Sequence, residues 1–110
     1  MNLGKSIQTL RKRQGLTQEA LADKAGLSRP SLSQIENNVV RPEQDTLKRI
    51  CEAIGVPESL VYINSFEKED VPEAKQGIYD QFFPLIQKMI KMVAVEGTNG
   101  PARGDGQEEE

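Results

Sequence analysis

Apolar residues in the first half of the chain recur at the three- and four-residue spacing of amphipathic helices. Leu3, Ile7 and Leu10 form the first such stripe, which predicts a helix over residues 2–14 with Gly15 as its C-terminal stop. The same periodicity, with its capping and turn residues, predicts further helices over residues 18–25, 29–37, 45–54 and 57–63. Five short helices in succession indicate an all-α domain.

The second and third predicted helices are joined by a sharp turn. Thr17 and Ser28 are N-cap residue types that stand immediately before each helix, and Gly26 can adopt the left-handed conformation between them. Ala22 is small enough to let the two helices approach closely. Residues 17–36 therefore predict a helix-turn-helix.

Helical geometry separates the two faces of the third helix. Leu32 and Ile35 are one turn apart, which places both on the side that faces the core. At about 100° per residue, burying this pair turns the opposite face toward solvent. The residues predicted to face outward are Arg29, Pro30, Ser33, Gln34 and Asn37.

The spacing of these residues resembles the phage-repressor and Cro-like helix-turn-helix family, also called the xenobiotic-response-element or Xre family. A small residue at Ala22, glycine at Gly26 and aliphatic residues at Leu27, Leu32 and Ile35 carry the resemblance, which extends over about residues 3–63. It implies a five-helix lambda-repressor-like domain over residues 1–64 that binds double-stranded DNA. In that family the outer face of the third helix reads bases, which implies base-reading roles for Arg29, Pro30, Ser33 and Gln34.

The chemistry of these side chains suits the major groove. Arg29 can donate two hydrogen bonds to guanine O6 and N7, and Gln34 can pair with adenine N6 and N7 or bond a phosphate. Ser33 can contact either a base or a phosphate. Pro30 departs from the polar residue usual at this position, and it fits the first helical turn while offering an apolar edge to a thymine methyl.

A second set of residues comprises candidate phosphate contacts. The N-terminus of the second helix favours an anion near Gln18, although a capped polar turn would look the same. The basic cluster around Arg11 equally fits a solvated helix end. In the loop after the third helix, Asn38 replaces the usual glycine and tolerates the left-handed conformation, and the uncharged Val39 removes one expected contact. Glu36 is expected to hold the fold through local polar contacts. The candidates are Thr17, Gln18, Ser28, Asn37, Arg41 and Arg11.

A charged linker over residues 65–72 precedes a second helical region over residues 73–95. Pro84 predicts that this region is kinked or divided into helices near 73–83 and 84–95. Its apolar stripe favours a homodimer interface, with docking on the same chain as the alternative. The predicted dimerisation residues are Ile78, Phe82, Leu85, Ile86, Met89 and Val93. The last residues, 96–110, lack a periodic pattern and are expected to form a disordered acidic tail.

Charge and composition restrict the possible functions. The net charge of −3 divides into +2 over residues 1–63 and −5 over residues 64–110, so the basic side chains concentrate where DNA binding is predicted. With no histidine and with Cys51 as the single cysteine, no internal disulfide and no ordinary metal site are expected, and Cys51 is predicted to be a buried apolar residue. No catalytic constellation or cofactor motif is present. No apolar run approaches the ~20 residues of a membrane helix, so a cytoplasmic protein is expected.

These observations predict a sequence-specific DNA-binding transcriptional regulator that acts as a dimer on a two-fold symmetric operator. Two alternatives use the same fold to bind a protein partner. One is a bridging-type interaction module, and the other is an antitoxin whose residues 72–95 would bind the toxin. An enzyme is not expected.

Overall fold

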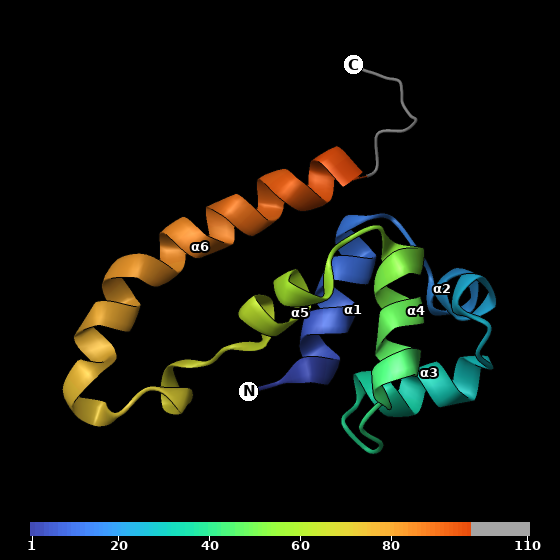
Figure 1. The fold of residues 1–110 in the computed structure, drawn as a ribbon, viewed down its shortest axis with the longest axis horizontal. Helices are drawn as coiled ribbons and strands as arrows, with labels where there is room; N and C mark the ends of the chain where they lie inside the picture. Colours follow the sequence, from blue (N-terminus) through green and yellow to red (C-terminus); the bar gives the residue numbers. More distant parts are fainter. Residues whose placement is uncertain (98–110) are drawn as a thin grey trace.

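The computed structural model describes the backbone of residues 1–97 and the side chains of residues 1–92. This part of the chain is all-α, as predicted, and contains six α-helices and two short 3-10 helices (Figure 1). Within it, no helix is both long and apolar enough to cross a membrane. In chain order the elements are α1 (Leu3–Arg13), α2 (Gln18–Ala25), α3 (Arg29–Glu36), α4 (Gln44–Ile54), α5 (Glu58–Ser65), η1 (Lys68–Asp70), η2 (Glu73–Lys75) and α6 (Gln76–Gly97).

The turn between α2 and α3 forms as the sequence predicts. The backbone N–H of Ala20 donates to Thr17 Oγ1 over 3.0 Å, and the N–H of Ser31 donates to Ser28 Oγ over 3.2 Å. Each cap satisfies a backbone donor that the first turn of the helix leaves free. Gly26 ends α2 with a φ of 72°, in the left-handed region where glycine has no Cβ penalty.

The apolar stripes of α1 to α5 meet in one core. Ile63, near the end of α5, does not join this core, because its side chain is 41% exposed. Val61 is fully buried instead, and two residues along a helix rotate the side chain by about 200°, which carries Ile63 to the outer side. The largest fully buried side chains of these five helices are Ile7, Leu10, Leu21, Leu32, Leu47 and Ile50.

Cys51 belongs to this core, as predicted. Its side chain is buried on the inner face of α4, and burial raises the pKa of its thiol to about 11, because the thiolate would lose its hydration there. The thiol is therefore protonated at neutral pH and acts as a small apolar group.

The start of α1 packs directly against the end of α3. A Cβ added at Gly4 would lie 2.5 Å from the carbonyl oxygens of both Ile35 and Glu36, so only glycine allows this approach. The backbone N–H of Gly4 donates to Oδ1 of Asn38 over 3.0 Å. Asn38 has a φ of 60°, which confirms that this asparagine takes the left-handed turn.

Gly4→Ala is expected to lower the free energy of unfolding by about 1 to 3 kcal/mol, because the new methyl group forces α1 away from α3. Urea denaturation followed by circular dichroism measures the change. Gly77→Ala is the matched control, because no atom beyond its chain neighbours and the nearby backbone of its own helix lies within 4 Å of the position of its added Cβ. A loss no larger than that of the control would contradict the close approach.

The C-terminal region forms one helix where two were predicted. Pro84 lies inside α6, and the helix changes direction along its length (Figure 1). Proline removes one backbone hydrogen bond, but side-chain packing continues on both sides of it: Tyr79 stacks on Phe83 with ring centroids 4.7 Å apart, and Ile90 is fully buried. Residues 96 and 97 belong to this helix, and the rest of the predicted tail lies outside the described residues.

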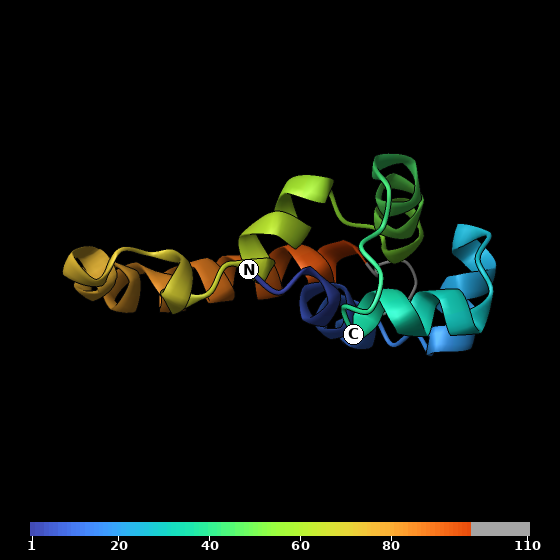
Figure 2. The same ribbon diagram turned by 90° about the horizontal axis from the view of Figure 1, so that it is seen from below.

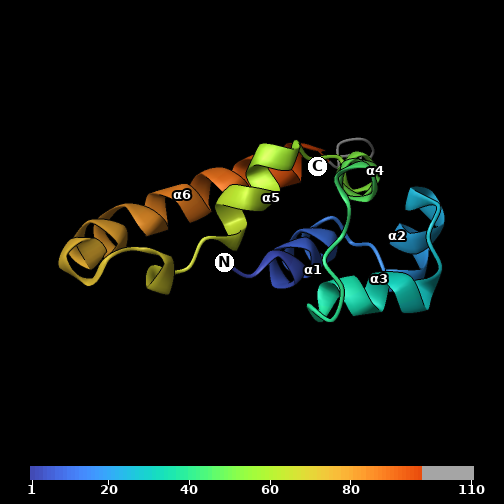
Figure 3. The ribbon, with the colours of Figure 1, turned by 60° about the horizontal axis from the view of Figure 1, so that its bottom comes forward.

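The helices α3 and α6 lie apart in space. α6 packs on α1 and α5, whereas α3 packs on α1 and α2. Figure 2 shows the N-terminal half of α6 extending beyond the five-helix unit at the end away from α2 and α3. In Figure 3, α1 separates α3 from α6. The outer face of α3 is therefore not covered by the C-terminal helix.

Candidate nucleic-acid interface

The outward face of α3 is built by burial of the opposite face. Leu32 and Ile35 are buried in the core, as their spacing predicts. The helix consequently presents Arg29, Pro30 and Gln34 to solvent, with Ser33 half-buried beside them. Pro30 lies in the first turn, where its missing N–H leaves no helical hydrogen bond unmade. The exposed face combines a guanidinium, a carboxamide and a hydroxyl group, which together can donate to and accept from base edges.

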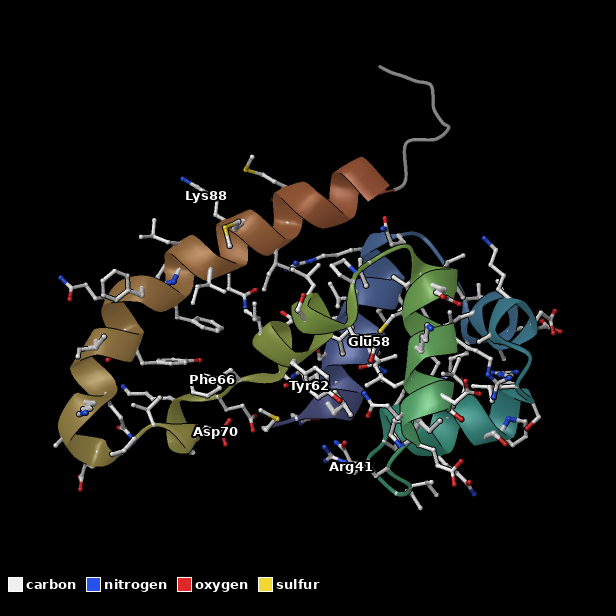
Figure 4. All side chains as sticks on the ribbon, viewed as in Figure 1. Arg41, Glu58, Tyr62, Phe66, Asp70 and Lys88 are labelled. Carbon is white, nitrogen blue, oxygen red and sulfur yellow. The ribbon has the colours of Figure 1, made fainter. Side chains whose placement is uncertain are left out.

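Polar residues surround this face on the turns that flank it. Thr17 and Ser28 are exposed, and their hydroxyl oxygens serve as helix caps. Asn37 at the end of α3 is exposed, and its Nδ2 donates to the carbonyl oxygen of Ser33 over 2.9 Å. Arg41 is exposed on the loop between α3 and α4 (Figure 4). Thr17, Ser28 and Asn37 form a polar border along the α3 face, whereas Arg41 lines a hollow with Met1, Asn2 and Glu67 beside the start of α1.

Arg11 does not belong to this border, and its expected place on an outer basic face is wrong. Its side chain is buried, with Nε 2.7 Å from Glu36 Oε2 and Nη2 3.1 Å from Glu36 Oε1. Nη1 donates to the carbonyl oxygen of Leu16 over 2.8 Å. Arg11 stands four residues after Ile7, at the edge of the buried stripe, so helical spacing indicated that it is buried. Its position among basic residues indicated exposure instead.

Glu36 connects the first three helices through its carboxylate. Besides the two bonds from Arg11, its Oε1 accepts from Nε2 of Gln18 over 3.0 Å. The carboxylate is fully buried, so these partners replace the water that it loses on folding. Two parallel N–H···O bonds also fix the relative orientation of the guanidinium and the carboxylate. The contacts set the end of α3 against α1 and the N-terminus of α2.

Glu36→Ala is expected to cost about 3 to 5 kcal/mol of unfolding free energy, because it leaves the Arg11 guanidinium buried without a counterion. Chemical denaturation measures the loss. The double variant Arg11→Met/Glu36→Leu, which removes both charges, should be clearly more stable than Glu36→Ala. Equal stability of the two variants would show that the unpaired guanidinium is not the source of the cost.

The predicted dimerisation residues divide into two groups on α6. Ile86 is half-buried against the core. The side chain of Val93 lies outside the described residues. The remaining four are exposed, and Met92, which was not among the predicted set, extends them: Ile78, Phe82, Leu85, Met89 and Met92. The helix therefore docks on the five-helix unit through Ile86 and the fully buried Ile90, while a separate apolar face stays in solvent.

A family model described as Helix-turn-helix matches residues 7–61, which is half of the chain and includes α2 and α3 in full. The chain belongs to the helix-turn-helix family. The resemblance stated from the spacing in residues 17–36 is thereby confirmed.

Curated relatives carry names of the same kind. The immunity repressor protein of Bacillus phage phi105 is 39% identical over 90 residues, which cover 71% of this chain and 62% of the relative. An uncharacterized helix-turn-helix-type transcriptional regulator of Mycobacterium tuberculosis is 30% identical over 77 residues, which cover 68% of this chain and 55% of the length of that regulator. The helix-turn-helix-type transcriptional regulator PuuR of Escherichia coli is 33% identical over 70 residues, which cover 64% of this chain and 37% of the length of PuuR. The chain spans less than two thirds of each relative. No solved structure is significantly similar to it.

Proposed function

We propose that this protein is a transcriptional regulator that binds double-stranded DNA in a sequence-specific manner by inserting α3 into the major groove. The exposed polar face of α3, opposite its buried aliphatic face, is the observation that carries the proposal. A helix of this diameter fits the major groove, where each base pair presents a distinct set of donors and acceptors. Membership of the helix-turn-helix family and the names of the relatives, a phage immunity repressor among them, support it.

The proposed roles follow from side-chain chemistry and position. Arg29 donates to guanine O6 and N7, Gln34 bonds adenine or a phosphate, Ser33 bonds a base or a phosphate, and Pro30 contacts a thymine methyl. Contacts to phosphates hold the helix in register without reading sequence. We assign these contacts to Thr17, Gln18, Ser28, Asn37 and Arg41. Gln18 also touches Glu36, so the same amide group that meets the phosphate is positioned by the buried ion pair.

We further propose that the protein acts as a homodimer on a two-fold symmetric operator. Two α3 helices set about 34 Å apart reach successive major grooves on one side of the DNA. The exposed apolar side chains of α6 support a symmetric contact between two copies, and the helix that carries them lies on the other side of α1 from α3 (Figure 3).

Selection of bound sequences from random double-stranded DNA tests this function directly. The expected product is a pair of inverted half-sites whose centres are about one helical turn, or a multiple of it, apart. Enrichment of a single half-site would contradict the dimer but not the DNA-binding function. No enrichment above the starting pool would contradict sequence-specific binding.

Arg29→Ala and Arg41→Ala are expected to differ in kind, because one removes a base contact and the other a phosphate contact. Arg29→Ala should cost about 1 to 3 kcal/mol on the selected site, relax preference at one base pair and leave binding to random DNA nearly unchanged. Arg41→Ala should weaken binding to both DNAs and lower the salt slope of log K by about 1. Both residues are exposed, so neither change should alter the fold.

Fluorescence anisotropy with labelled selected and random duplexes, at several salt concentrations, measures these effects. Each variant serves as the control for the other, since both lose one arginine charge. Equal losses on selected and random DNA for Arg29→Ala would refute its role as a base reader.

A further inference from the structure

The N-terminal half of α6 forms one wall of an open apolar groove. The opposite wall is α5 with the segment that follows it, and Phe66 lies between the two (Figure 4). The groove has a volume of about 510 Å³, and Lys75 is the one charged residue among the described residues that line it. Tyr79 forms part of its floor, with ring centroids 4.7 Å from Phe83 and 6.1 Å from Phe66. Such a surface binds apolar side chains far better than it binds water.

The groove continues directly into the exposed apolar face of α6. Ile78 and Phe82 line the groove and also begin the exposed face, which runs on through Leu85, Met89 and Met92. These five side chains are each between 52% and 61% exposed. A contiguous apolar surface of this kind is typical of a contact site in a soluble protein. One partner that covers the exposed face must also meet the mouth of the groove.

Acidic and basic side chains are distributed unevenly along this part of the chain. Residues 67–80 carry five acidic and two basic side chains, whereas residues 81–92 carry two basic side chains and no acidic one. Of these two, Lys88 stands one helical turn from Leu85 and Met92, and Lys91 lies on the opposite side of the helix. An antiparallel arrangement of two α6 helices places the acidic end of each beside the basic end of the other. A parallel arrangement would place like charges together, which is unfavourable.

We infer that a second copy of this chain covers the groove, through an antiparallel pair of α6 helices whose two-fold axis passes close to Leu85. Leu85 is the midpoint of the exposed face between Ile78 and Met92, so the axis brings Leu85 of the two copies together. Met89 and Met92 of one copy then lie at the groove mouth formed by Ile78 and Phe82 of the other. Methionine is flexible enough to fill an irregular hollow of this kind. The interface is isologous, so one contact covers both apolar surfaces.

This inference rests on the homodimer proposed above and specifies its interface. It also keeps DNA binding and assembly on separate elements. α3 takes no part in the contact, because α6 packs on α1 and α5 and α3 lies beyond α1 (Figure 3).

Cross-linking through one introduced cysteine in the full chain tests the arrangement. Cys51 does not interfere, because it is buried and its thiol has a pKa of about 11. Under mild oxidation, Leu85→Cys is expected to form a disulfide-linked dimer, since a disulfide requires Cα atoms within about 7 Å. Ile78→Cys alone should not cross-link, because antiparallel pairing separates its two copies by about 20 Å along the helix. A mixture of Ile78→Cys and Met92→Cys should give the mixed dimer.

Two controls accompany these variants. Lys91→Cys places an exposed thiol on the opposite side of the same helix and measures cross-linking by random collision. The unmodified chain measures any contribution of Cys51. Leu85→Cys should cross-link at least about tenfold faster than Lys91→Cys, because dimer formation raises the effective concentration of its thiols.

The outcomes separate this inference from the proposed function. Cross-linking of Ile78→Cys with itself, at a rate equal to that of Leu85→Cys, would indicate a parallel pair and overturn the inference. A chain that sediments as a monomer and cross-links no faster than the Lys91→Cys control would also overturn it. Selection from random DNA tests the proposed function separately. If a DNA site is enriched, sequence-specific binding stands even when one of these two cross-linking results overturns the inference. If no site is enriched, the proposed function is contradicted even when the cross-link forms.

Discussion

The buried carboxylate of Glu36 is the point at which the helices of the candidate DNA-binding surface meet. Arg11 approaches it from α1 with two nitrogens, and Gln18 approaches it from the start of α2. A buried ion pair of this kind contributes little net stability against an apolar alternative, but its geometry admits one arrangement of its partners. Its main physical effect is therefore to orient α3, whose C-terminal residue is Glu36, relative to the helix that precedes it.

The same packing that stabilises α3 also creates its outer face. Leu32, Ile35 and Glu36 are buried on one side of a two-turn helix, and Arg29, Pro30 and Gln34 on the other side face solvent. The hydroxyl groups of Thr17 and Ser28 accept hydrogen bonds from backbone N–H groups in the first turns of α2 and α3. Stability and the proposed DNA recognition thus use different sides of one helix and place few conflicting demands on it.

In the C-terminal helix, packing and exposure are divided along the length of the helix and not only between its two sides. α6 docks through Ile86 at its middle and Ile90 in its second half, while its N-terminal part projects from the five-helix unit. The segment after α5 holds this projection in place: Nζ of Lys68 lies 2.9 Å from Oδ2 of Asp80, and Nε2 of Gln76 donates to the carbonyl oxygen of Val71 over 3.2 Å. A projecting helix anchored at both ends can present an apolar face without unfolding. Docking on the chain and contact with a second copy are therefore compatible, although the sequence presented them as alternatives.

Local patterns determined the features that depend on near neighbours in the chain. Helical spacing identified the buried pair of α3, and residue type identified the caps and the left-handed positions Gly26 and Asn38, because these properties depend on backbone geometry within a few residues. The tertiary structure decided the features that depend on distant contacts. Arg11 is buried because Glu36, 25 residues away, supplies its counterion, and α6 continues through Pro84 because packing with other elements outweighs one lost hydrogen bond. The sequence shows that residue 11 is an arginine and residue 84 a proline. Whether such a side chain is buried or paired depends on which distant residues the folded chain places next to it.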